Sequence, residues 1–162
     1  MRFAPQGVRG VAGMSRASRF GTQPNYIRSA NRSVGVIVET ETPQAVEQIE
    51  AISSVDGMDA FFLGMADLSA AMGHAGVPDH PAVVDLMSRT LQRCKALGKP
   101  IGTVAASAEP VAQHRAAGFD FIGVASDLGL MMNAAQKVIA ALRSPSGEHV
   151  HSLATGTRSS PS

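Results

Sequence analysis

The sequence predicts an α/β fold in which parallel strands alternate with helices. Short runs of apolar residues alternate with segments of helical apolar spacing, glycine and proline separate them, and acidic residues follow the apolar runs. Continuous apolar runs are typical of strands buried on both faces of a parallel sheet. Because strand–helix–strand crossovers are right-handed, four such units in series form either an open doubly wound sheet or part of an eight-stranded βα barrel.

The first unit begins with an apolar run over Val34–Thr40. A helix is expected from Thr42-Pro43 to about Ile52, because proline at the first helical position loses no hydrogen bond that the helix needs. The second unit begins with a strand over Met58–Leu63, which leads into the segment Gly64–Ser69, expected to be a loop.

The helix of the second unit is expected over His80–Leu97, where apolar residues recur at helical spacing. Gly98 then ends it as a left-handed cap. A third strand is expected over Pro100–Ala106.

The third helix is expected over Glu109–Ala117 and ends at Gly118. The fourth unit comprises a strand over Phe119–Ala125 and a helix over Leu128–Leu142. No G-x-G-x-x-G follows any of the four strands, so the sequence gives no support to a dinucleotide-binding fold.

The two ends of the chain differ from this pattern, so we expect three segments: a lead-in over residues 1–33, the βα units over 34–143 and a disordered tail over 144–162. The lead-in is interpreted as a surface loop, with a transit peptide or an anion- or nucleic-acid-binding arm as alternatives. It has no acidic residue and six arginines: Arg2, Arg9, Arg16, Arg19, Arg28 and Arg32.

The composition indicates a globular, cytoplasmic protein. With 44% hydrophobic residues and a formal net charge of +1, the chain can bury a core and has no marked charge preference for nucleic acid. Its one cysteine, Cys94, lies on an apolar helical stripe and is expected in the core. No run approaches the roughly 18 apolar residues that span a membrane.

Three acidic residues lie at the end of a predicted strand or after one, at the edge where parallel βα folds have their active sites: Glu39 closes the first strand, Asp67 follows the second and Asp127 follows the fourth. Carboxylates from neighbouring strand ends suit a hard divalent cation such as Mg²⁺ or Mn²⁺. The alternative is that each acid caps the following helix, which we favour for Asp127.

Ordered motifs along the chain resemble the HpcH/HpaI aldolase family. The resemblance runs from Pro5 to Arg143 and covers the carboxyl-terminal four units of that family's (β/α)8 barrel, which is therefore the fold class we expect, as an incomplete TIM barrel. The motifs that carry it are Gly7-Val8-Arg9-Gly10, Ser15-Arg16-Ala17-Ser18-Arg19-Phe20, Val38-Glu39-Thr40, Val55-Asp56-Gly57-Met58-Asp59, Gly64-Met65-Ala66-Asp67-Leu68-Ser69, Met72-Gly73-His74, His80-Pro81 and Ile122-Gly123-Val124-Ala125-Ser126-Asp127.

The resemblance implies a metal-dependent lyase that cleaves a 2-oxo-4-hydroxy acid to pyruvate and an aldehyde. It implies that Glu39 and Asp67 bind the metal, which would be Mg²⁺, Mn²⁺ or Co²⁺, and that Gly64, Ala66 and Asp67 bind the substrate. The loop Gly73–Gly76 is similar to the 2-dehydro-3-deoxyglucarate aldolase branch. A metal at this position would stabilise the enolate that forms when the carbon–carbon bond breaks.

No catalytic residue of the family is matched in this chain, because the family's histidine–aspartate pair and its arginine belong to the other half of the barrel. An inactive fragment that binds metal, or a chain that needs a homo-oligomer or a complementing half-barrel, is therefore the alternative. Ile37 and Met65 replace a glutamine and a proline that many relatives carry. A Schiff-base mechanism is disfavoured, since the only lysines are Lys95, Lys99 and Lys137.

The histidines offer weaker candidates for a base. His74 follows the predicted metal loop, but the family position it matches has no catalytic role. His80 is expected to cap its helix, and His114 is expected on an exposed helix face. A His-x-His pair formed by His149 and His151 lies in the expected disordered tail.

Overall fold

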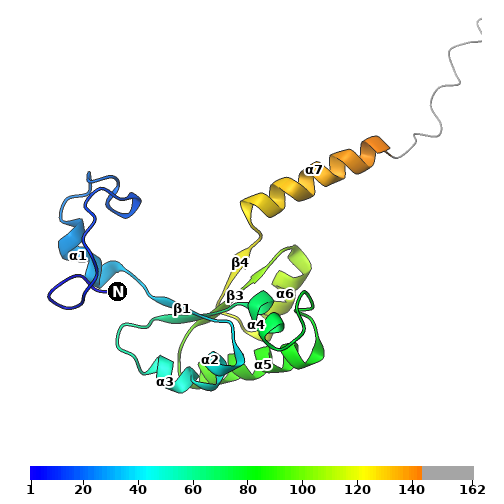
Figure 1. The fold of residues 1–162 in the computed structure, drawn as a ribbon, viewed down its shortest axis with the longest axis horizontal. Helices are drawn as coiled ribbons and strands as arrows, with labels where there is room; N and C mark the ends of the chain where they lie inside the picture. Colours follow the sequence, from blue (N-terminus) through cyan, green and yellow to red (C-terminus); the bar gives the residue numbers. More distant parts are fainter. Residues whose placement is uncertain (144–162) are drawn as a thin grey trace, which may run out of the picture. The chain divides into compact units, whose positions relative to one another are not determined.

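The computed structural model describes residues 1–143, which form two compact units, Met1–Val124 and the segment that begins at Ala125. The tail and its two histidines lie outside the described residues. The first unit is built on a parallel sheet whose strands follow one another in chain order (Figure 1). The strands are β1 (Ile37–Thr40), β2 (Ala60–Leu63), β3 (Ile101–Ala105) and β4 (Phe121–Val124).

The strand order distinguishes the two folds that the sequence pattern allowed, an open doubly wound sheet and a βα barrel. A doubly wound sheet reverses its strand order at a switch point, whereas a βα barrel adds each strand beside the previous one. The order β1-β2-β3-β4, all parallel, agrees with the barrel. The expected four βα units of a TIM barrel are therefore confirmed.

Helices follow each strand as expected, with two further helical segments in the lead-in. Proline occupies the first position of both α2 and α5, and Gly98 and Gly118 adopt positive φ angles of 65° and 105° just beyond the helices they end. The helical segments are η1 (Arg16–Ser18), α1 (Tyr26–Ser33), α2 (Pro43–Glu47), α3 (Ile49–Ser53), α4 (Met65–Ala71), α5 (Pro81–Ala96), α6 (Ala108–Ala117) and α7 (Asp127–Arg143).

The expectation of a loop over Gly64–Ser69 was wrong, because this segment forms most of α4. Met65, Leu68 and Ser69 are buried in this helix. Their spacing of three and four residues places them on one helical face, which packs into the core. The short segment therefore becomes helical through tertiary burial, which the sequence motif alone did not indicate.

The first expected helix is divided into α2 and α3 at Gln48, which leaves the helical conformation at φ −98° and ψ 14°. Arg93 of α5 donates hydrogen bonds to the carbonyls of Val46, at 2.7 Å, and Glu47, at 3.2 Å. A continuous helix would use these acceptors for its own N–H groups. The arginine satisfies them instead and also pairs with Glu50.

The two faces of the sheet differ in their burial. One face carries Phe61, Leu63 and Ile101, which are fully buried against α2, α3 and α5 (Figure 1). The opposite face is open: Ile37 is 57% exposed and Val104 is 46% exposed. Backbone alternation explains this, since successive residues of a strand point to opposite faces.

The second unit contains α7, none of whose residues is buried. In the part of the chain that the structure describes, no helix is long and apolar enough to cross a membrane.

Candidate metal centre

Glu39 and Asp67 both lie at the carboxyl edge of the sheet. Glu39 is the third residue of β1 and pairs in register with Phe62. Asp67 lies in the first turn of α4, which follows β2 after the single residue Gly64. The N–H of Gly64 donates to the carbonyl of Thr40 at 3.2 Å, so the β1–β2 pairing extends past the ends of both strands. This short connection fixes both acids at one end of neighbouring strands.

Gly64 provides the space beside the Glu39 carboxylate. A Cβ at this position would lie 3.1 Å from Oε1 of Glu39, tighter than ordinary van der Waals contact, and 3.5 Å from Oε2 of Glu41. Glu41 was not singled out in the sequence. The signal that could have found it is its spacing, since residues two apart at a strand end share a face.

The donor set suits a hard cation that keeps several waters. Within residues 1–143 no group of three histidine, cysteine, aspartate or glutamate side chains is arranged to hold a metal ion. Mg²⁺ and its analogues are commonly bound by one or two carboxylates together with water and substrate oxygens. Glu39 and Asp67 are exposed, so their oxygens are accessible to such an ion.

Asp127 has the structural role that the sequence favoured. Its Oδ1 accepts a hydrogen bond from the N–H of Leu128 at 2.8 Å, and Ser126 Oγ accepts one from Gly129 at 3.0 Å. These side chains satisfy free donors at the start of α7.

The histidines are held by structural contacts. His80 caps α5 as predicted, with Nδ1 accepting from the N–H of Ala82 at 3.3 Å, and its ring stacks on His74 with 3.5 Å between centroids. The prediction of an exposed His114 was wrong. This side chain is half-buried with its ring edge against Phe119, and burial lowers its pKa. Phe119 precedes β4, so His114 lies near the amino edge of the sheet, away from the two acids.

Lys95, Lys99 and Cys94 make contacts that stabilise the fold. Lys95 pairs with Asp120, and Lys99 donates to the carbonyl of Met58 at 2.8 Å. Cys94 is buried in the core as predicted, and desolvation raises its thiol pKa to about 11. Neither lysine has the desolvated, unpaired amine that a Schiff base requires.

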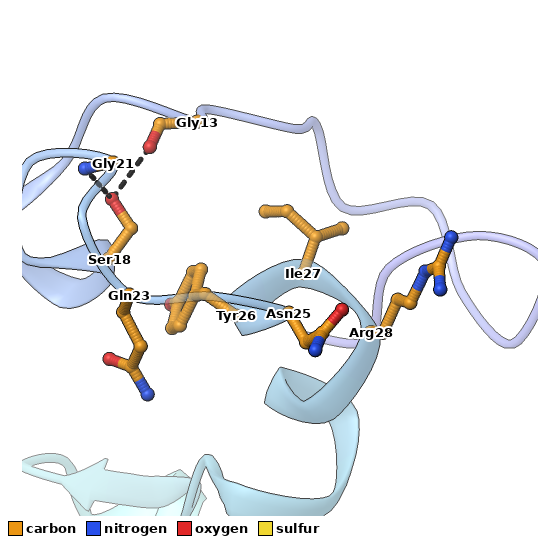
Figure 2. Close-up of a pocket in the computed structure, with 8 residues that line it drawn as sticks. All are labelled: Gly13, Ser18, Gly21, Gln23, Asn25, Tyr26, Ile27 and Arg28. Atoms are coloured by element: carbon orange, nitrogen blue, oxygen red, sulfur yellow. Dashed lines mark hydrogen bonds between the residues drawn. The ribbon is translucent and has the colours of Figure 1, made fainter.

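The lead-in contains a small cavity of about 270 Å³, shown in Figure 2, whose lining includes Ser18, Tyr26 and Arg28. The Ser18 hydroxyl donates to the carbonyl of Gly13 at 2.6 Å and accepts from the N–H of Gly21 at 3.1 Å. Because these bonds and a further one accepted from the N–H of Ser15 at 3.1 Å use its hydrogen-bonding capacity, Ser18 holds the loop together rather than offering a nucleophile.

A larger cavity, of about 600 Å³, lies between the lead-in and the amino end of β1. Three of the charged groups in its lining are bound within the chain: Arg2 pairs with Asp56 at 2.9 Å, and Asp59 accepts a hydrogen bond from the N–H of Val36 at 2.6 Å. Chemistry in parallel βα folds occurs at the opposite, carboxyl edge. The candidate site therefore remains at Glu39 and Asp67.

The family model described as HpcH/HpaI aldolase/citrate lyase matches residues 2–134. A 2-dehydro-3,6-dideoxy-6-sulfogluconate aldolase of Pseudomonas putida is 43% identical over 143 residues, which cover 88% of this chain and 56% of the relative. A pyruvate aldolase of Rhizobium etli is 39% identical over 86% of this chain and 55% of its own length. The chain thus spans about half the length of these relatives.

The solved structures agree in fold. An HpcH/HpaI aldolase/citrate lyase family protein from Burkholderia cenocepacia superposes with a TM-score of 0.76 at 38% identity, covering 88% of this chain and 57% of the other. A second structure, of an HpcH/HpaI aldolase from Desulfitobacterium hafniense, has a TM-score of 0.75 at 22% identity over 92% of this chain and 58% of its own, and supports the fold alone. The chain belongs to the HpcH/HpaI aldolase/citrate lyase family.

Proposed function

We propose that this chain contributes the metal-binding part of a class II aldolase that cleaves a 2-oxo-4-hydroxy acid to pyruvate and an aldehyde. The observation that carries the proposal is the placement of Glu39 and Asp67 at the carboxyl ends of adjacent strands, beside the side-chain-free Gly64. Relatives named for aldolase activity on a sugar-acid derivative and for pyruvate aldolase activity support the reaction class.

Glu39 and Asp67 would hold the cation, Mg²⁺ or Mn²⁺ with Co²⁺ as a further candidate. When bound, such a cation supplies Lewis-acid stabilisation of the negative charge that develops as the carbon–carbon bond breaks. The N–H groups of Ala66 and Asp67, in the first turn of α4, have no intrahelical acceptors and would bind the substrate carboxylate. Gly64 leaves the space in which the substrate approaches.

Proton transfer requires a group besides these residues. His80 uses its Nδ1 as a helix cap, and His114 lies near the amino edge of the sheet. We therefore assign the base and the arginine of the family to a segment or subunit that completes the site. Catalysis is accordingly proposed for the completed assembly.

A second candidate function is a half-barrel that binds the cation and catalyses nothing until it pairs with another chain. The open face of the sheet favours it, because Ile37 and Val104 expose large apolar side chains there. Within residues 1–143, the outer strands β1 and β4 also have no strand partner on their free sides, which leaves backbone groups available for pairing. A second copy or a complementing half-barrel would cover both features.

Titration calorimetry with Mn²⁺, with and without pyruvate, tests the proposal, followed by an assay of pyruvate release from a 2-oxo-4-hydroxy acid. Glu39→Ala and Asp67→Ala should each abolish binding, whereas Glu47→Ala, which removes an exposed carboxylate on α2, should not. Binding with turnover supports the aldolase. Binding without turnover supports the pairing half-barrel, and unchanged affinity in both site variants rejects the site.

A further inference from the structure

Glu41 follows Glu39 by two residues and lies just past the end of β1. Since residues two apart along an extended chain point to the same side, the two carboxylates share a face. The hydrogen bond from Gly64 N–H to the Thr40 carbonyl continues the pairing of β1 with β2, which places Glu41 opposite Gly64.

The two carboxylates border one small space. A Cβ at Gly64 would lie 3.2 Å from the Cβ of Glu41, 3.5 Å from its Oε2 and 3.1 Å from Oε1 of Glu39. Glu41 is half-buried, and within the described range 1–143 its carboxylate has no hydrogen-bond or ion-pair partner. Two negative charges that border one space repel each other, and the partial burial of Glu41 weakens the screening of its charge by water.

We infer that Glu41 is an auxiliary carboxylate of the metal centre that raises its affinity for a divalent cation. The inference rests on the proposed function, which places the cation between Glu39 and Asp67. Glu41 acts through its charge or through a water bound to the cation, and not as a third direct ligand, because the described residues contain no group of three side chains that could hold a metal ion. It is a positioning and charge-supplying residue and does not touch the reacting atoms.

The size of the effect follows from Coulomb's law. One unit charge several ångströms from a divalent cation at a solvated site changes its affinity on the order of tenfold. The same interaction weakens as salt is added, because the Debye length falls from about 10 Å at 0.1 M to about 3 Å at 1 M. A residue that acted only by supporting the local fold would not give this salt dependence.

The experiment measures Mn²⁺ affinity by calorimetry for the full chain and for Glu41→Gln, Glu41→Asp, Glu39→Gln and the control Glu47→Gln. Glu41→Gln should bind about tenfold more weakly at low salt, with a smaller difference at 1 M salt. Glu41→Asp should recover most of the affinity, and Glu47→Gln should bind like the wild type. Circular dichroism establishes that each variant is folded as the wild type is.

The outcomes separate this inference from the proposed function. If the wild type binds no Mn²⁺, the proposed metal centre fails and the role of Glu41 fails with it. If the wild type binds, Glu39→Gln loses binding and Glu41→Gln binds with unchanged affinity, the metal centre stands and only the role of Glu41 is overturned. A loss in Glu41→Gln that is independent of salt also overturns the role, since charge would not be its cause.

Discussion

Replacing Gly102 with alanine should destabilise the sheet through a single steric contact. Gly102 lies in β3 between Phe62 of β2 and Phe121 of β4, whose ring centroids are 6.2 Å apart. A Cβ at Gly102 would lie 2.6 Å from Cζ of Phe121 and closer still to two other atoms of that ring. The backbone of Gly102 is not in the left-handed region, so alanine meets no conformational penalty and the ring alone opposes it. Overpacking of this kind costs about 1–3 kcal/mol of unfolding free energy.

A double-mutant cycle measured by urea unfolding tests the reasoning. With Phe121→Ala in the background, Gly102→Ala should become neutral or stabilise by about 0.4–1 kcal/mol, because alanine restricts the unfolded chain more than glycine does. Gly123→Ala in β4 is the matched control, since its Cβ would meet its neighbours at an ordinary 3.8 Å. An equal cost for Gly102→Ala in both backgrounds, or the same cost for Gly123→Ala, would refute the steric account.

Three further predictions concern titratable groups. Burial lowers the pKa of His114, so its contribution to stability is present above its unfolded pKa of about 6.5 and is lost as pH falls through the lower folded pKa. The urea concentration at the unfolding midpoint should therefore fall between pH 7.5 and pH 5 in the wild type. In His114→Gln this fall should be smaller. Hydrogen bonds from Lys95 and from the N–H of Ile101 lower the pKa of Asp120, so Asp120→Asn should reduce the melting temperature at pH 7. The difference from wild type should begin to shrink below the unfolded pKa of about 4 and be lost as pH falls through the lower folded pKa. The thiol pKa of Cys94, raised to about 11, predicts negligible reaction with a disulfide reagent at pH 8 in the folded chain and rapid reaction in urea; rapid reaction without urea would contradict its burial.

The fold could be predicted to the extent that local chemistry determines it. Pro43 and Pro81 correctly marked helix starts, and Gly98 and Gly118 correctly marked helix ends, because each effect depends on the residue's own backbone. The break at Gln48 could not be predicted, since it depends on hydrogen bonds from Arg93, which lies 45 positions further along the chain. Contacts between distant residues leave no local signal.

The sequence indicated the edge of the sheet at which the candidate residues lie, and not how their side chains are arranged there. The strand order puts Glu39 and Asp67 at one edge, as the alternation of strands and helices indicated. That Asp67 belongs to a helix depends on the burial of one face of α4 in the core. That Glu41 and Glu39 both face Gly64 depends on how β1 and β2 align past their last paired residues. A shift of one residue in that register would turn every side chain of β1 to the other face.

Acidic side chains at the amino edge of the sheet hold the strands in register. Asp59, directly before β2, accepts a hydrogen bond from the N–H of Val36 at 2.6 Å, just before β1 begins. Asp120, directly before β4, accepts one from the N–H of Ile101 at 2.9 Å, where β3 begins. The same arrangement occurs twice, with an aspartate ahead of one strand binding the start of the preceding strand. The hydrogen bonds of these two carboxylates therefore stabilise the sheet.

At the carboxyl edge the opposite holds. Glu39, Glu41 and Asp67 have no hydrogen-bond or ion-pair partner in the portion of the chain that the structure describes. Three carboxylates without counter-charges at one end of adjacent strands repel each other and add nothing to the stability of the fold. A divalent cation bound at the proposed site would reverse that balance, because its charge would attract these carboxylates in the folded chain. Metal binding should therefore raise the free energy of unfolding, because the cation would bind the folded chain and not the unfolded one. The acids at the amino edge of the sheet stabilise the fold by themselves, whereas those at the carboxyl edge would do so only with a bound cation.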